Sequence, residues 1–152
     1  MNAELLTHNQ TESLTRRVWL LIKTPIVLGL LITPIRFSLE MSGLPDGAIF
    51  LFGALWLTLG LSIYWGIRLY RRNQAHLTLL LCLTIFSPIS RIPIALLWYI
   101  DNKLEIGSHY GLYFHNFQSA ILNQIGYGSL IQIIPGFIIG TITIAIMKHW
   151  HL

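Results

Sequence analysis

Four long runs of apolar residues follow one another along the chain, separated by polar stretches. They cover about residues 18–37, 47–67, 77–100 and 128–147. The second is the cleanest, with no charged residue in the 21 positions from Gly47 to Ile67. A helix of that length measures about 31 Å, close to the roughly 30 Å hydrocarbon thickness of a bilayer. The pattern predicts an all-α membrane protein built as a bundle of four transmembrane helices, because a backbone in lipid must satisfy its own hydrogen bonds.

The two ends of the chain set the predicted domain boundaries. Residues 1–17 are polar and lack the short apolar core and small-residue cleavage site of a signal peptide. We therefore expect the first apolar run to stay in the membrane as an anchor. The sequence predicts a polar cytoplasmic segment over 1–17, one transmembrane domain over 18–147 and a short cytoplasmic tail over 148–152.

The composition agrees with lipid as the solvent of this domain. Charged residues make up 11% of the 152 positions and hydrophobic residues 54%, whereas a soluble domain carries about 25% charged residues. The net charge of +4 does not indicate a nucleic acid partner, because the basic residues stand at segment ends and form no stripe with interleaved aromatics. The single cysteine, Cys82, excludes an internal disulfide.

The distribution of cations predicts how the chain is threaded. With the N-terminus in the cytoplasm, six cations lie inside and two, Arg36 and Lys103, lie at or beyond the outer face. The reverse threading would invert that count. We therefore expect both termini in the cytoplasm and a multi-pass protein of the cell membrane, which is the inner membrane if the source is bacterial. The six inside cations are Arg16, Arg17, Arg68, Arg71, Arg72 and Lys148.

A long connection from Asp101 to Tyr127 separates the third and fourth apolar runs. Four of its apolar residues recur at helical spacing: Phe114, Phe117, Ile121 and Ile125. This spacing is typical of an amphipathic helix lying on the outer membrane surface. The alternative is an extension of the fourth helix, with Gly126 and Gly128 as a bend.

Small residues mark where helices approach one another in lipid, which gives little hydrophobic drive for their association. They recur every fourth residue in the second and fourth runs: Thr58, Ser62 and Gly66, then Gly136 and Gly140. We expect these faces to meet within one four-helix bundle. Homodimerisation through the same faces is the alternative.

The third run contains S-P-I-S-R-I-P over residues 87–93. Pro88 and Pro93 lack backbone N–H groups, so each leaves a carbonyl one turn earlier without its usual donor. Ser87 and Ser90 can replace some of these donors by bonding back to the chain. The motif predicts a kink or break of the third helix at the two prolines.

Arg91 lies inside this run, where a charged side chain costs at least roughly 2.5–3.5 kcal/mol. We expect it to face the bundle interior and to take a partner from Glu40, Asp101 or Gln132, with Glu40 the better carboxylate. Its role is either structural or the binding of an anion or lipid headgroup, because a guanidinium is the preferred fork for phosphate or carboxylate. The candidate ligand-binding residues are Arg91, Arg36, Ser90, Gln132 and Glu40.

The first run carries a shorter version of the same motif. T-P-I-R at residues 33–36 places a hydroxyl–proline pair before Arg36, as Ser87 and Pro88 stand before Arg91. Both runs go from inside to outside, which is compatible with a parallel repeat of the kind found in some transporters. The echo places the two arginines towards the same face of the membrane.

No motif indicates a cofactor, a metal or a catalytic site. None of the six histidines lies within an apolar run at the depth of a bis-histidine haem, and no Cys/His spacing resembles a zinc site. Paired intramembrane carboxylates, a serine–histidine pair and a glycine-rich phosphate loop are all missing from the runs. We expect neither a cofactor nor a metal.

Three classes of function remain. Small size and small-residue faces favour a non-catalytic accessory or scaffolding subunit, bound to membrane lipids and to a larger membrane protein. The arginine in a proline-broken helix favours instead a small transporter or binding protein for an anionic solute or lipid headgroup. An enzyme acting on outer-leaflet lipids is the third class, and its available acids and bases are Glu40, Asp101, His109 and His115.

Overall fold

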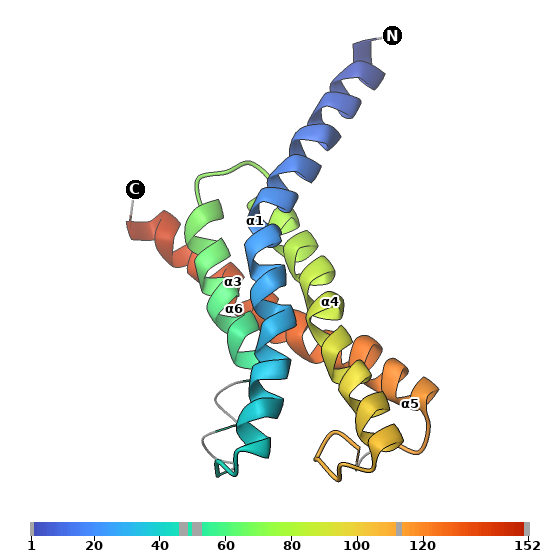
Figure 1. The fold of residues 1–152 in the computed structure, drawn as a ribbon. Helices are drawn as coiled ribbons and strands as arrows, with labels where there is room; N and C mark the ends of the chain where they lie inside the picture. Colours follow the sequence, from blue (N-terminus) through green and yellow to red (C-terminus); the bar gives the residue numbers. More distant parts are fainter. Residues whose placement is uncertain (1, 46–48, 50–52, 112–113, 151–152) are drawn as a thin grey trace.

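The computed structural model describes residues 2–45, 49, 53–111 and 114–150, with side chains from residue 14 onward. This part of the chain is helical, without a strand (Figure 1). One element, η1, is a π-helix inserted between two α-helices. The elements in chain order are α1 (Asn2–Met41), α3 (Ala54–Leu69), α4 (Ala75–Leu104), α5 (Phe117–Ile121), η1 (Leu122–Tyr127) and α6 (Gly128–Trp150).

Three helical segments are long and apolar enough to cross a membrane. They are Leu14–Met41 within α1, the whole of α4, and the continuous rod Phe117–Trp150 formed by α5, η1 and α6. The fourth main helix, α3, is apolar but has 16 residues, which correspond to about 24 Å. Residues 47, 48 and 50–52 of the predicted second run lie outside the described part. The fold is thus all-α with four main helices, and its three long apolar helices indicate a multi-pass membrane protein.

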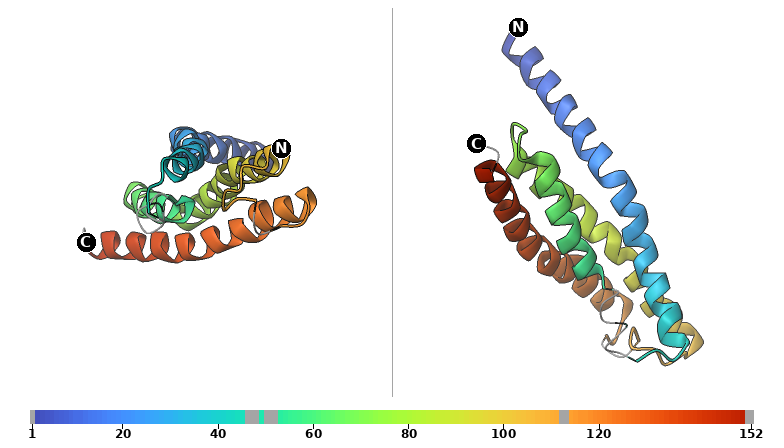
Figure 2. Two further views of the ribbon diagram at one scale, coloured as in Figure 1. Left: turned by 60° about the horizontal axis from the view of Figure 1, so that its bottom comes forward. Right: turned by 90° about the vertical axis from the view of Figure 1, so that its left-hand side faces the viewer.

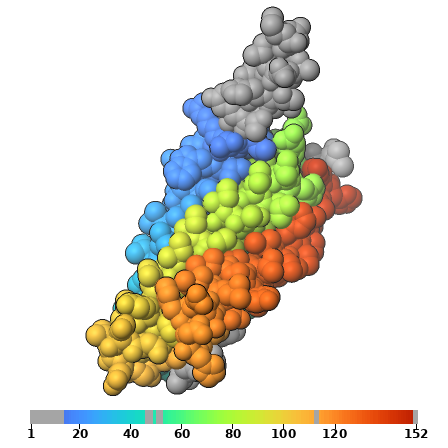
Figure 3. Space-filling view, turned by 90° about the vertical axis from the view of Figure 1, so that its right-hand side faces the viewer, coloured from blue at the N-terminus to red at the C-terminus, as the bar shows by residue number. Residues whose placement is uncertain are grey.

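The helices form an elongated bundle whose two termini lie at the same end (Figure 1). We call this the terminal end, and it also holds the turn 70–74 between α3 and α4. The opposite loop end holds the end of α1 and the segments 105–111 and 114–116. Figure 2 shows α3 running beside α6 in the same direction. On the face shown in Figure 3, α4 lies between α1 and α6.

The buried core lies where α4 meets α1 and α3. Trp65 of α3 is fully buried and packs edge-on against Phe86 of α4, with ring centroids 5.9 Å apart at an angle of 80°. Its indole Nε1 donates to the Leu21 carbonyl of α1 at 3.2 Å. One side chain therefore joins three helices, and a donor that would be costly unpaired in lipid is satisfied.

Glycines let α6 approach both α3 and α4 closely. A Cβ added at Gly140 would lie 2.6 Å from Leu79 Cδ2, and one at Gly136 would lie 2.9 Å from Leu83 Cδ2 and from Ser62 Oγ. The structure thus places the predicted small-residue faces of the second and fourth runs against each other within the chain. Their hydroxyls are satisfied locally, since Thr58 and Ser62 each donate to the carbonyl one turn earlier at 2.7 Å.

Of the predicted kink or break at Pro88 and Pro93, the break does not occur. α4 continues as one α-helix through both residues, because helices packed on its sides hold it in place and proline is tolerated within membrane helices. The expected repair by serines is also different: Ser90 Oγ donates to the Ser87 carbonyl at 2.9 Å, and Ser87 Oγ is buried without a partner.

The connection before the fourth run follows the second of its two predicted alternatives. Residues from Phe117 onward extend α6 as one rod rather than forming a separate surface helix. The π-helical turns of η1 lie between Asn116, which caps α5 by accepting the Ser119 N–H at 2.8 Å, and Gly128. A π-helical insertion rotates the side chains that follow it, and such insertions are frequent at functional sites.

Candidate functional site

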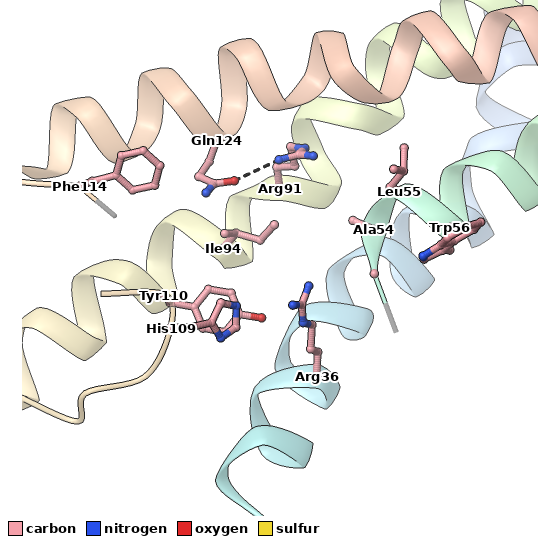
Figure 4. Close-up of a pocket in the computed structure, with 11 residues that line it drawn as sticks. Arg36, Ala54, Leu55, Trp56, Arg91, Ile94, His109, Tyr110, Phe114 and Gln124 are labelled. Atoms are coloured by element: carbon pink, nitrogen blue, oxygen red, sulfur yellow. Dashed lines mark hydrogen bonds between the residues drawn. The ribbon is translucent and has the colours of Figure 1, made fainter. Parts of the chain in front are cut away.

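A cavity of about 300 Å³ opens at the loop end, between α1, α3, α4 and η1. Figure 4 shows its polar side chains directed into the same space from different elements. The lining comprises Arg36, Gly53, Ala54, Leu55, Trp56, Arg91, Ile94, His109, Tyr110, Phe114 and Gln124.

Arg91 enters the cavity from the middle of α4. Its Nη1 donates to Gln124 Oε1 of η1 at 3.0 Å (Figure 4). Its Nε is buried and has no hydrogen-bond partner. Gly128 provides the room for the guanidinium, because a Cβ there would overlap Nη1 and lie 2.5 Å from Cζ. The partner of Arg91 is thus the side-chain amide of Gln124. The expectation that Glu40, Asp101 or Gln132 would be this partner is wrong.

Arg36 reaches the cavity from the last turns of α1. It is half-buried, and its Nε is also buried without a partner. Arg36 and Arg91 are the two arginines of the echoed sequence motif, and both line this one cavity. Two half-buried cations that line one cavity repel each other, and a negative group in the cavity would offset that repulsion.

Glu40, one turn after Arg36, holds the loop that closes the cavity. Its carboxylate accepts the His109 backbone N–H at 2.9 Å and contacts His109 Nδ1. The His109 ring lies against Tyr110, with centroids 3.9 Å apart. Because Glu40 is committed to His109 and does not line the cavity, it leaves the two arginines unneutralised.

Tyr110 contributes a buried phenol to the same wall. Burial raises its pKa to about 12, with a smaller increase from Glu40 and an opposing decrease from Arg36. At physiological pH the phenol therefore remains protonated and presents a hydrogen-bond donor to the cavity.

Asp101 builds the loop rather than the cavity. Its side chain is buried, and Oδ1 accepts the Ser108 N–H at 3.1 Å. Ser108 Oγ in turn accepts the Tyr110 N–H at 3.3 Å. A Cβ at Gly111 would overlap Asp101 Oδ2, so the loop wraps closely around this carboxylate. The aspartate thus positions His109 and Tyr110 without reaching the cavity.

Ser90 and Gln132, two of the predicted ligand residues, lie in the bundle interior outside this cavity. Both are fully buried, and neither amide atom of Gln132 has a partner. Leu79 and Leu83 face Gly140 and Gly136 across α4 and α6, and the same antiparallel spacing sets Ser87 opposite Gln132. The interior beneath Arg91 therefore contains polar groups whose hydrogen-bonding capacity is unused.

The cavity lining is cationic and otherwise neutral. It contains two arginines, His109 and three polar or aromatic donors, and no acidic residue. Among the described residues no three His, Cys, Asp or Glu side chains converge as a metal site would require. This chemistry suits a small anion, since guanidinium forks, a phenol and an amide are all suited to carboxylate or phosphate oxygens.

Sequence reasoning missed Gln124, His109 and Tyr110 as members of the site. The register of Gln124 depends on the π-helical insertion, which has no clear sequence signal. The loop residues depend on the Asp101 and Glu40 contacts, which join positions 69 apart in the case of Glu40 and His109. Comparison of the chain with protein families, with curated proteins and with solved structures finds no match.

Proposed function

We propose that this chain is a multi-pass membrane protein that binds a small anion, or the anionic headgroup of a lipid, in the cavity at the loop end. The observation that carries the proposal is the convergence of Arg36 and Arg91 on one cavity that has no acidic lining residue. Each guanidinium keeps a buried Nε without a partner. An anion in the cavity would be attracted by both guanidinium groups and would offset the repulsion between them.

The energetic reason lies in the low dielectric of the site. An arginine within a membrane span costs at least roughly 2.5–3.5 kcal/mol, and a second cation nearby adds repulsion. A bound carboxylate or phosphate reverses the sign of that interaction. The cavity thus favours an anionic ligand over a neutral one of equal size.

The size of the cavity limits the ligand. A volume of about 300 Å³ is at the lower limit of small-molecule sites, which run to about 1,000 Å³. A small carboxylate, a phosphate ester or a lipid headgroup fits these dimensions. With the predicted threading, the cavity belongs to the outer half of the membrane.

The geometry ranks this function above the two other classes. The accessory-subunit expectation rested on small-residue faces, and those of α3 and α6 pack against each other within the chain. The enzyme would need free acids and bases, yet Asp101 is committed to the loop and Glu40 to His109. Binding of a larger membrane partner stays an expectation.

The proposal is tested by anion-dependent thermal stabilisation of the purified protein in detergent. Inorganic phosphate, sulfate, a short carboxylate and a soluble short-chain anionic phospholipid are titrated at constant ionic strength against chloride. At about 100 times the dissociation constant, a specific ligand should raise the unfolding midpoint by about 5–10 °C. Arg91→Gln should abolish the rise, and Arg91→Lys should keep the fold and weaken it.

Lys103→Gln is the matched control, because Lys103 is an exposed cation at the same end and does not line the cavity. This variant should retain the full stabilisation. The proposal fails if no anion of the series stabilises the wild type while Arg91→Gln lowers the folded yield. That outcome would assign Arg91 a purely structural role.

A further inference from the structure

A second basic cavity lies at the terminal end, between the start of the apolar part of α1 and the end of α3. Its volume is about 410 Å³. Four arginines and three leucines line it: Arg16, Arg17, Leu20, Leu21, Arg68, Leu69 and Arg72. None of these residues is acidic, and the cavity shares no residue with the one at the loop end.

Two hydrogen bonds hold the walls of this cavity together. Arg17 Nη1 donates to the Asn73 carbonyl at 3.1 Å and joins α1 to the turn after α3. Deeper in the bundle, Trp65 Nε1 donates to the Leu21 carbonyl. The spacing between α1 and α3 is therefore fixed before any ligand arrives, which lowers the ordering cost of binding.

The remaining arginines are available at the rim. Arg16, Arg68 and Arg72 are all exposed and come from α1, from α3 and from the turn after α3, with the Arg68 guanidinium 5.6 Å from the centroid of the Tyr64 ring. Leu20 and Leu21 lie deeper along α1 and Leu69 ends α3, and Leu20 is 55% exposed. The cavity thus has a cationic rim above an apolar wall that opens towards the lipid.

We infer that this cavity binds an anionic phospholipid of the leaflet at the terminal end. The rim arginines bind the headgroup phosphate, and Leu20 and Leu21 contact the start of an acyl chain. A free phosphate would use the rim alone, whereas an amphiphile uses both parts, which is why a lipid fits better. Basic pockets between membrane helices on the cytoplasmic side commonly bind anionic headgroups.

The test measures lipid preference by native mass spectrometry of the protein released from nanodiscs. The nanodiscs contain equal parts of phosphatidylglycerol and phosphatidylcholine, and the readout is the ratio of the two lipids that stay bound. Wild type should retain phosphatidylglycerol preferentially. The double variant Arg68→Gln/Arg72→Gln should reduce this preference by about tenfold or more. Both side chains are exposed, so the fold should survive, and a thermal scan in phosphatidylcholine checks this.

Arg71→Gln is the matched control. Arg71 stands in the same turn as Arg72 and is exposed, but it does not line the cavity. This variant should keep the preference, and so should Arg91→Gln, whose site is the loop-end cavity. An equal loss in Arg71→Gln would show attraction by bulk surface charge and overturn the inference.

A competition arm separates the lipid from its headgroup. Glycerol phosphate or inorganic phosphate, added at constant ionic strength, should leave the bound lipid in place. Complete displacement by phosphate at constant ionic strength would assign the cavity to a free anion and overturn the lipid inference. Equal retention of both lipids by wild type would also overturn it.

Discussion

At the scale of single residues, Arg91 is tolerated in the membrane because its surroundings are shaped around it. One N–H is used by Gln124, and the guanidinium lies across the bare backbone of Gly128. The amide oxygen supplies a neutral acceptor, so the positive charge persists. A carboxylate partner would have cancelled that charge and closed the site to a ligand.

Gly128→Ala should disturb this arrangement directly. The new Cβ would overlap Arg91 Nη1, and the flexible side chain should move away and lose Gln124. Since a hydrogen bond to a charged group contributes about 1.5–3 kcal/mol, we expect a comparable loss of unfolding free energy. Anion-dependent stabilisation should weaken as well. Both quantities are measured by thermal unfolding with and without phosphate.

Gly126→Ala provides the comparison within the same rod. Its Cβ would find Leu122 Cδ1 at 3.7 Å, an ordinary contact, so stability should change by no more than about 1 kcal/mol. An equal loss of unfolding free energy in Gly128→Ala and Gly126→Ala would contradict the close packing of Arg91 on Gly128.

The sequence singled out Arg91 and Arg36, which both line one cavity, but it did not predict the contact of Arg91 with Gln124. An arginine in an apolar run is costly by itself, so its type and position are sufficient to single it out. Gln124 and His109 reach the site through an inserted π-helical turn and a loop held by Asp101 and Glu40. These depend on tertiary contacts, which hydropathy does not encode.

At the scale of elements, close backbone packing takes the place of hydrophobic burial. A lipid tail is as apolar as leucine, so helices in lipid gain by approaching until their backbones touch. Gly66 and Gly140 permit this, since a Cβ at Gly66 would lie 2.9 Å from the Gly140 carbonyl oxygen. A backbone atom cannot move aside as a side chain can.

Gly66→Ala should therefore separate α3 from α6 and lower the unfolding free energy by about 1–3 kcal/mol. Gly60→Ala is the matched substitution in the same helix, because nothing lies within 4 Å of its Cβ. It should be neutral or slightly stabilising, since alanine favours the helix by up to about 1 kcal/mol. Chemical denaturation in mixed detergent measures both, and a larger loss in Gly60→Ala would refute the assigned interface.

The long helices were predictable from hydropathy, and their interruptions were not. Runs of apolar residues require helices in lipid, which is why α1, α4 and α6 each contain a predicted run, although α1 already begins at Asn2. Pro88 and Pro93 suggested a break from local chemistry alone, yet flanking helices keep α4 continuous. The predicted second run begins at Gly47. The described helix α3 begins later, at Ala54.

At the scale of the whole molecule, the two ends of the bundle carry different chemistry. The terminal end gathers six cations, five of them arginines of α1, α3 and the turn after α3, together with the cavity lined by four arginines. The loop end carries the cavity lined by Arg36 and Arg91 and the acids Glu40 and Asp101. An asymmetry of this kind sets the direction of insertion, because cations are retained in the cytoplasm.

The last prediction concerns that direction. Cys82 is the single cysteine of the chain and is fully buried, and Cys82→Ala gives a background without cysteine. In this background, two exposed asparagines report on the two ends of the bundle. Asn102→Cys, near the loop end, should react with a membrane-impermeant maleimide on intact cells. Asn73→Cys, in the terminal-end turn, should react only after permeabilisation.

The reversed labelling pattern would invert the threading and move the loop-end cavity to the cytoplasmic half of the membrane. Equal reaction of both on intact cells would be incompatible with a bundle that crosses the membrane, because the two positions lie at opposite ends of α4.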